Sequence, residues 1–331
     1  MKKLLKIVSF CLLCILGTTR VNAQIDPHFS QYYANPLWLN PGMTGVMNGD
    51  YRVSVNAKQQ WSSISNSYLT AGASFDMAPT KNLAFGGMVL NQNAGELSYN
   101  YLSALASAAY RVRFGQSGLN IVNFGIQAGV LNKSFDPSKM TTGSQFNPGS
   151  GYNGNLPTNE TFSSTNTLAP DVNFGAVYFD ANDAKQVNVF VGVSGNHLTR
   201  PIDRFLGNDV RIPIRYTAHG GARIKISDAL DITPNGLYMR QGTAREISAG
   251  AYAQYYVNPE TDLLFGSNYR HEDASIIYIG MHLKNIAFGV SYDINTSNLN
   301  RATGSKGGLE LSVSFTSRRG VTGPNFFCPR L

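Results

Sequence analysis

Charge and cysteine are both scarce in this chain of 331 residues. Only 14% of the residues are charged, and the three cysteines are Cys11, Cys14 and Cys328. Downstream of the first 25 residues, no apolar run approaches the roughly 20 residues that a membrane-spanning helix needs. The low charge is unusual for a soluble helical enzyme, and the missing apolar runs argue against a helical membrane domain.

Catalytic and ligand-binding motifs are also missing. The five histidines are scattered, and the sequence contains no H-E-x-x-H, G-x-S-x-G or Walker motif. Its C-x-x-C pattern, Cys11 to Cys14, lies in the apolar run at the start of the chain. Gly149, Gly151 and Gly154 spell G-x-G-x-x-G, but they sit in a polar loop without a strand before them or a helix after them. We therefore predict that the protein is not an enzyme, and we assign no catalytic residue, cofactor or metal site.

The first 23 residues have the features of a secretory signal peptide. Lys2, Lys3 and Lys6 form a basic start, residues 7–16 form a short apolar run, and residues 21–23 match a small-residue cleavage site. We expect cleavage before Gln24. A lipid anchor on Cys14 is less favoured, because Leu13 precedes it and lipid-modified cysteines usually follow a small residue.

Cleavage would change the charge and the cysteine content. Removing the four basic residues of the leader from the chain's 27 leaves 23 basic and 20 acidic residues, a net charge of about +3. This weak charge implies no nucleic-acid partner. Cys328 would remain as the single cysteine, which excludes an intramolecular disulfide.

Alternation is the dominant pattern in the rest of the chain. In residues 120–130, apolar side chains from Val122 to Val130 alternate with Asn123, Gln127 and glycines. Alternation with a period of two indicates a strand with one apolar face and one polar, solvated face. Fourteen segments follow this pattern: 51–58, 67–77, 82–91, 100–114, 118–133, 169–179, 185–196, 214–226, 229–239, 245–257, 261–270, 274–283, 285–295 and 307–317.

The connections between these segments alternate between short and generally longer, and the strand count is even. Both features are typical of a bacterial outer-membrane barrel, whose strands need about 9–11 residues. A soluble β-sandwich usually has shorter strands, and a β-solenoid needs a fixed repeat that is absent here. We therefore predict an all-β protein, a transmembrane antiparallel up-and-down β-barrel of about 14 strands over residues 50–318.

Two segments outside the predicted barrel have no period. Residues 24–49 combine three prolines with aromatic residues and read as an irregular segment that packs on something. Residues 319–331 form a short tail, which we expect on the periplasmic side. Glycines on the inward face of the strands leave lumen space that residues 24–49 could fill as a plug, or they serve only to let the sheet curve.

The same two segments carry a resemblance to a known family. Residues 24–45, QIDPHFSQYYANPLWLNPGMTG, resemble the start of mature PorP/SprF proteins of the type IX secretion system in Bacteroidota. The closing residues Phe327-Cys328-Pro329-Arg330-Leu331 are similar to that family's Cys-Pro ending, with Leu331 in place of the usual aromatic residue. The resemblance covers the whole mature chain and is strongest at its start.

The resemblance implies an integral outer-membrane barrel that supports protein secretion, with links to gliding motility. Its partners would be outer-membrane lipid, other secretion components or an exported surface adhesin, and no nucleic acid. We expect the partner-binding residues at the two chain ends, where they would form a docking surface on the periplasmic rim: Asp26, Pro27, His28, Phe29, Gln31, Tyr32, Asn35, Pro36, Asn40, Pro41, Phe327, Cys328 and Pro329. A transport barrel or porin for small or hydrophobic solutes is the alternative.

Overall fold

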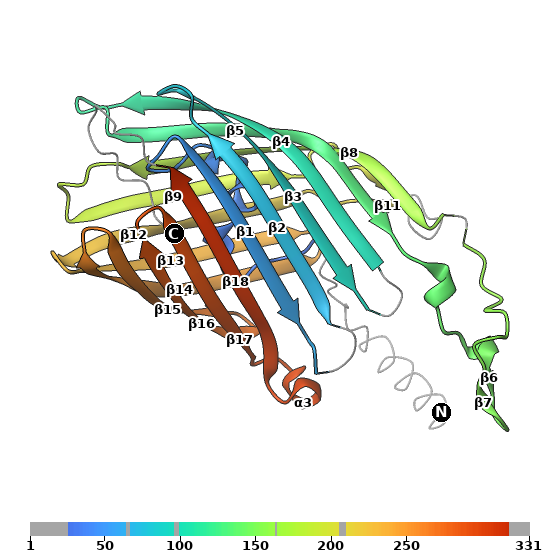
Figure 1. Cartoon of the computed structure of the whole chain (residues 1–331). Helices are drawn as coiled ribbons and strands as arrows, with labels where there is room; N and C mark the ends of the chain where they lie inside the picture. Colours follow the sequence, from blue (N-terminus) through green and yellow to red (C-terminus); the bar gives the residue numbers. More distant parts are fainter. Residues whose placement is uncertain (1–25, 64–66, 96–98, 163, 205–209, 318–331) are drawn as a thin grey trace, which may run out of the picture.

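The chain folds into one closed β-barrel (Figure 1). The structure is a computed structural model that describes residues 26–63, 67–95, 99–162, 164–204 and 210–317. Within these residues, the barrel strands are β1 (Tyr51–Gln60), β2 (Tyr68–Met77), β3 (Leu83–Ala94), β4 (Tyr99–Phe114), β5 (Asn120–Ser134), β8 (Asn166–Asp180), β9 (Val187–Asn196), β12 (Arg215–Ser227), β13 (Leu230–Gln241), β14 (Ala244–Asn258), β15 (Thr261–Arg270), β16 (Ala274–Leu283), β17 (Ile286–Asn295) and β18 (Lys306–Ser317).

Every barrel strand is antiparallel to both of its neighbours. The sheet closes where β1 pairs with β18, from Tyr51 opposite Ser317 to Gln60 opposite Gly308. Closure leaves no sheet edge, so the backbone hydrogen bonds of the wall are satisfied between strands. The predicted fold class, including its 14 strands, is confirmed.

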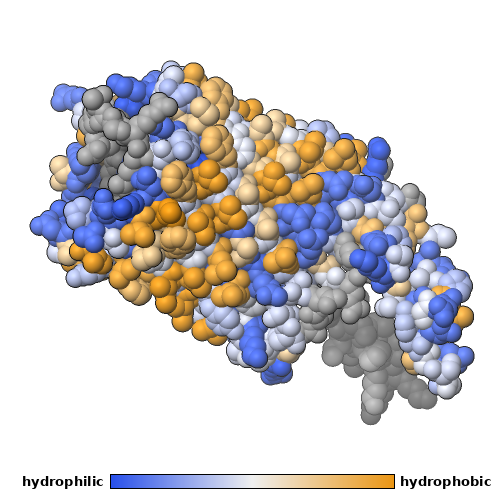
Figure 2. Space-filling view, in the orientation of Figure 1, coloured by the Kyte–Doolittle hydropathy of each residue, from blue (hydrophilic) through white to orange (hydrophobic). Residues whose placement is uncertain are grey.

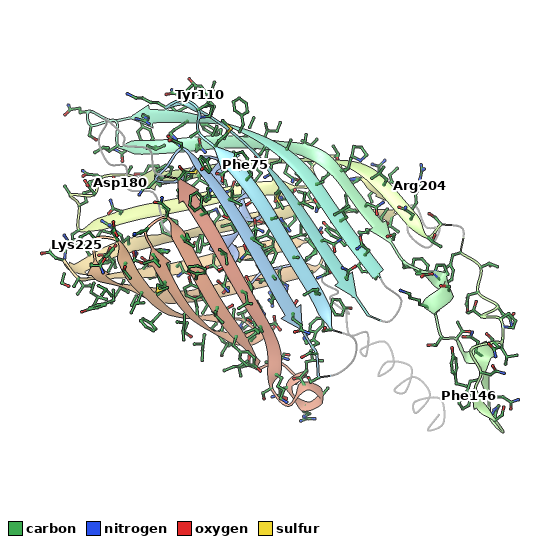
Figure 3. The ribbon with its side chains drawn as sticks, in the orientation of Figure 1. Phe75, Tyr110, Phe146, Asp180, Arg204 and Lys225 are labelled. Carbon is green, nitrogen blue, oxygen red and sulfur yellow. The ribbon has the colours of Figure 1, made fainter. Side chains whose placement is uncertain are left out.

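The connections divide the barrel into two rims. Tight turns such as 228–229 and 284–285 form the short-turn rim, and loops such as 135–165 and 197–214 form the long-loop rim. Figure 3 shows Asp180 and Lys225 at one end of the barrel, and Arg204 and Phe146 at the other. The long loops carry β6 (Phe146–Asn147), β7 (Gly151–Tyr152), β10 (Ile202–Asp203), β11 (Val210–Arg211), two 3-10 turns (Pro137–Lys139 and Gly143–Gln145) and α3 (Asn300–Thr303).

The outer face of the barrel is apolar. On β5, Phe124, Ile126 and Val130 are exposed, whereas Asn123 and Gln127 point inward and are buried. On the face in view, Figure 2 shows an apolar band across the middle of the barrel, with hydrophilic residues towards both ends. Among the described residues, the short helices are neither long nor apolar enough to cross a bilayer. An apolar outer band of this kind is what lipid requires of an integral outer-membrane barrel.

This face assignment can be tested at Ile126. We expect Ile126→Arg to cost about 2–4 kcal/mol of folding free energy in lipid, because the guanidinium would face hydrocarbon. Ser150→Arg, on an exposed loop residue, is the control and should cost almost nothing. Urea unfolding in lipid vesicles measures both values. Equal costs for the two variants would show that Ile126 does not face lipid.

Candidate functional site in the barrel lumen

Residues 26–49, here called the lumen segment, run through the inside of the barrel. At its start, the Asp26 carboxylate lies 2.8 Å from His197 Nε2 and 3.1 Å from Arg215 Nη1, at the long-loop rim. Directly after its end, the Asp50 amide donates to Ser317 O at 3.0 Å, at the short-turn rim. The lumen segment therefore spans the barrel from one rim to the other.

Short helical turns allow this proline-containing stretch to fold compactly. They are η1 (Tyr32–Ala34), α2 (Pro36–Leu39) and η2 (Pro41–Met43). Asn40 caps η2, because its Oδ1 accepts from the Gly42 amide at 2.8 Å. Phe29 and Trp38 pack edge to face with ring centroids 5.4 Å apart. The lumen segment thus has its own small core, to which the wall adds inward-facing apolar residues.

A charged cluster at the long-loop rim holds the start of the segment. His197 lies between two carboxylates, with Nε2 2.8 Å from Asp26 and Nδ1 2.9 Å from Asp171. Burial opposes the imidazolium charge, but the two carboxylates outweigh it and raise the pKa of His197 to about 9. Burial likewise opposes the Asp26 charge, yet His197 and Arg215 hold the pKa of that carboxyl below its usual range. His197 and Asp26 are therefore both charged at neutral pH.

The His197 cluster predicts a pH dependence of stability. Because its folded pKa lies above the ordinary value of 6.5, its contribution is complete below about pH 6.5 and is lost as the pH rises towards 9. Stability should fall by at most about 1.4 kcal/mol per pH unit across this window. Urea unfolding from pH 6 to 9.5 measures the fall, and His197→Gln should remove most of it. An unchanged slope in His197→Gln would rule out this residue as the cause.

A second charged cluster lies on another part of the wall, where β1, β15, β17 and β18 face the segment. Asp293 Oδ2 accepts from Ser30 Oγ at 2.7 Å and from Arg270 Nη2 at 2.8 Å, and lies 3.2 Å from Lys58 Nζ. Lys58 is fully buried and also donates to Ser30 Oγ at 2.8 Å. A buried charge is tolerated only when it is paired and hydrogen-bonded. The charges here pair within the wall, and the Ser30 hydroxyl of the lumen segment adds hydrogen bonds to them.

Glu310 on β18 binds the backbone of the segment directly. Its fully buried carboxylate accepts from the amides of Ser30 at 2.6 Å and Gln31 at 3.2 Å. The Gln31 side chain also accepts from Ser312 Oγ at 2.7 Å and donates to Glu310 O at 3.0 Å. Because these bonds engage main-chain amides, they fix the path of the segment and not only its side chains.

Glycines in the wall make room for the Asn40-Pro41-Gly42 turn. Gly125 and Gly175 are directly opposite each other on β5 and β8. A Cβ added at Gly125 would lie 2.0 Å from Pro41 O, and one at Gly175 would lie 2.0 Å from Asn40 Oδ1. The expectation that inward glycines leave lumen space therefore holds here. It does not hold at Gly129, where a Cβ would meet Ala104 O of the wall itself.

Polar side chains also secure the turn and the end of the segment. Asn40 Nδ2 donates to Ala176 O at 3.2 Å and to Val193 O at 3.1 Å. Asn123 Nδ2 donates to Gly42 O at 2.7 Å and to Thr44 O at 2.8 Å. These bonds join the segment to β5, β8 and β9, on the side of the barrel opposite the Asp293 cluster.

The predicted partner-binding residues of the N-terminal stretch are all inside the barrel. Buried residues are Asp26, Pro27, His28, Phe29, Gln31, Tyr32, Asn35, Pro36, Asn40 and Pro41. This position differs from the expected docking surface on the periplasmic rim, because an even strand count fixes where β1 begins but not where the chain before it runs. Partner binding by these residues stays a prediction. Phe327, Cys328 and Pro329 lie outside the described residues.

Sequence reasoning missed several residues of the wall and its loops that hold the segment, namely Lys58, His197, Arg270, Asp293 and Glu310. Glu310, for example, stands between Leu309 and Leu311, which face outward and are 44% and 49% exposed. Alternation therefore places its carboxylate inside. A charged residue facing inward is the available signal, but its partner 280 residues away is not visible in the pattern.

Comparison with solved structures supports the fold. A mutant of the monoaromatic hydrocarbon channel TodX has a TM-score of 0.53 and 10% identity, covering 86% of this chain and 94% of that one. The monoaromatic hydrocarbon channel CymD has a TM-score of 0.50 and 11% identity, covering 90% and 96%. At such identities the likeness concerns the barrel fold alone.

Comparison with characterised proteins and with family models gives two further findings. No curated protein matches the sequence. The family model described as type IX secretion system membrane protein PorP/SprF matches residues 21–315, which include the lumen segment and nearly the whole barrel. This chain, an integral outer-membrane β-barrel, therefore belongs to the PorP/SprF family.

Proposed function

We propose that this barrel supports type IX secretion by binding other secretion components or an exported surface adhesin, and that its lumen is not a conduit. The observation that carries the proposal is the segment that runs through the lumen. The segment is bound at both rims and in the middle by hydrogen bonds to β1, β5, β8, β9, β12, β17 and β18. A solute would have to displace these contacts to pass.

Transport of solutes, the alternative function, would require a different arrangement of the lumen. A channel for small or hydrophobic solutes needs either a continuous passage or a plug that leaves readily. Here Asp26 ties the segment to His197 and Arg215 by buried ion pairs, and breaking such a pair costs several kcal/mol. The membership in a secretion family also favours a protein partner. The likeness to hydrocarbon channels supports the shared barrel fold only.

The C-terminal tail is the proposed docking element for that partner. Strand β18 ends at Ser317, so removal of residues 320–331 leaves every described barrel strand intact. We expect the truncated barrel to fold normally and the partner to be lost from the cell surface. Heat-modifiable gel mobility reports the fold, and antibody labelling of intact cells reports the partner.

Complete deletion of the gene is the companion experiment. The proposal predicts that surface proteins fail to appear while solute uptake is unchanged. A folded truncation with a normal amount of partner on the surface would remove the tail from the proposal. Normal secretion together with impaired solute uptake in the complete deletion would replace it with the transport function.

A further inference from the structure

Two exposed arginines stand directly opposite each other on the β13–β14 hairpin. Arg240 and Arg245 are cross-strand partners, next to the two-residue turn 242–243. Both lie on the outward face, because their neighbours Met239 and Gln241 are buried, and Tyr238 and Ile247 on the same face are exposed. The barrel thus presents two guanidinium groups side by side to its surroundings at the long-loop rim.

The fold does not account for this pair. Like charges directly opposite each other on adjacent strands are destabilising. Local compensation is weak: Arg240 Nε donates to Gly242 O at 3.4 Å, and Arg245 Nη2 lies 4.0 Å from Glu272 Oε2. The Arg245 and Glu272 side chains are 61% and 72% exposed, so solvent screens their attraction. The pair therefore lacks a strong anionic partner among these neighbours.

The surroundings of the two arginines indicate which kind of anion would compensate their charge. Tyr238 precedes the pair on the outward face, and Tyr216 on β12 lies opposite Arg240 with 57% exposure. Tyrosines on the outer face of a barrel gather at the level of the lipid headgroups. Both arginines therefore lie where a lipid headgroup would lie.

We propose that Arg240 and Arg245 form a binding site for the phosphate-bearing headgroup of an outer-leaflet glycolipid. The planar guanidinium donates two parallel hydrogen bonds to a phosphate, which is the strongest arrangement open to an exposed arginine. A phosphate between the two side chains would turn their mutual repulsion into shared attraction. The long-loop rim faces the outer leaflet when the long loops are extracellular, as in bacterial barrels. This site is independent of the proposed secretion function.

The test uses purified full-length protein in detergent, with diphosphoryl lipid A as the probe. Binding should raise the thermal midpoint of the wild type, as read by heat-modifiable gel mobility. The double variant Arg240→Gln/Arg245→Gln should bind at least about tenfold more weakly and lose this rise. Without lipid, the double variant should be as stable as the wild type or more stable, since the repulsion is gone. A purely structural pair would instead lose stability.

Matched controls separate this site from general charge effects. Arg200→Gln/Arg301→Gln removes two exposed charges from loops of the same rim and should keep the full rise. The proposal is overturned by an equal rise with dephosphorylated lipid A, or by a double variant that responds like the wild type. An equal rise with inorganic phosphate would show a free-anion site. A rise with phosphatidylglycerol but not with lipid A would exclude the outer-leaflet glycolipid.

Discussion

Gly125→Ala is expected to give a barrel that conducts ions. The added Cβ would lie 2.0 Å from Pro41 O and 2.3 Å from Pro41 C, and backbone atoms cannot rotate aside as a side chain can. The Asn40-Pro41-Gly42 turn must therefore move away from Gly125, which breaks its bonds to β8 and β9. We expect a loss of about 1–3 kcal/mol in stability and a steady ion conductance in planar bilayers that the wild type lacks.

The barrel offers a close control on the same strand. At Gly129, an added Cβ would lie equally close, 2.0 Å, to a backbone oxygen, but that oxygen belongs to Ala104 on β4. Gly129→Ala should therefore destabilise the wall without conductance. Gly143→Ala, which meets nothing within 4 Å, should change neither property. If Gly129→Ala conducts ions as readily as Gly125→Ala, the conductance does not depend on the contact between Gly125 and the Asn40-Pro41-Gly42 turn.

Asp293→Asn should be among the most destabilising single substitutions in the protein. The change keeps the shape but removes the negative charge between Lys58 and Arg270, which are 0% and 3% exposed. Removing one partner of a buried ion pair costs about 3–5 kcal/mol, because the remaining charge is left uncompensated. Arg270 retains Asp273 at 2.5 Å, whereas Lys58 retains the facing Glu310 carboxylate, which is shared with two backbone amides, so most of the cost should fall on Lys58. Urea unfolding in lipid vesicles measures the loss.

A second substitution identifies the cause of that loss. Lys58→Met in the Asp293→Asn background removes the uncompensated charge and should restore a large part of the stability. Glu260→Gln is the surface control: Glu260 lies 3.9 Å from Lys284, and both side chains are more than half exposed. Its effect should stay within about 0.5 kcal/mol. No recovery in the double variant would mean that the Asn side chain, and not the stranded lysine charge, causes the damage.

The barrel wall was predictable from sequence because its two faces meet different solvents. On β5, outward residues such as Ile126 face lipid, and inward residues such as Gln127 contact polar atoms of the lumen segment. Exposed apolar and buried polar residues therefore alternate along this strand. The predicted fifth segment, 118–133, differs from β5 by only one or two residues at each end. Connection lengths then gave the two rims, because tight turns can join only adjacent antiparallel strands.

The path of the lumen segment was not predictable in the same way. Its residues have no period, and its position depends on contacts such as Ser30 with Glu310 that join opposite ends of the chain. Alternation shows that Glu310 faces inward but not what it binds. The expected docking surface assumed that the chain before β1 stays near the rim where β1 begins. The bonds from the Ser30 and Gln31 amides to Glu310, and the glycines that make room for the Asn40-Pro41-Gly42 turn, hold the segment inside the barrel instead. Neither feature has a local sequence signature.

The central claim is tested most directly by cross-linking the lumen segment to the barrel wall and measuring surface display of the exported partner. Thr44 Oγ1 and Ser107 Oγ lie 3.2 Å apart, so Thr44→Cys/Ser107→Cys in a Cys328→Ser background places two thiols within bonding reach. We predict that the oxidised protein still displays the partner in normal amount, because its function does not use the lumen. Display that is lost on oxidation and restored by reduction would show that the segment must move, and would contradict this account.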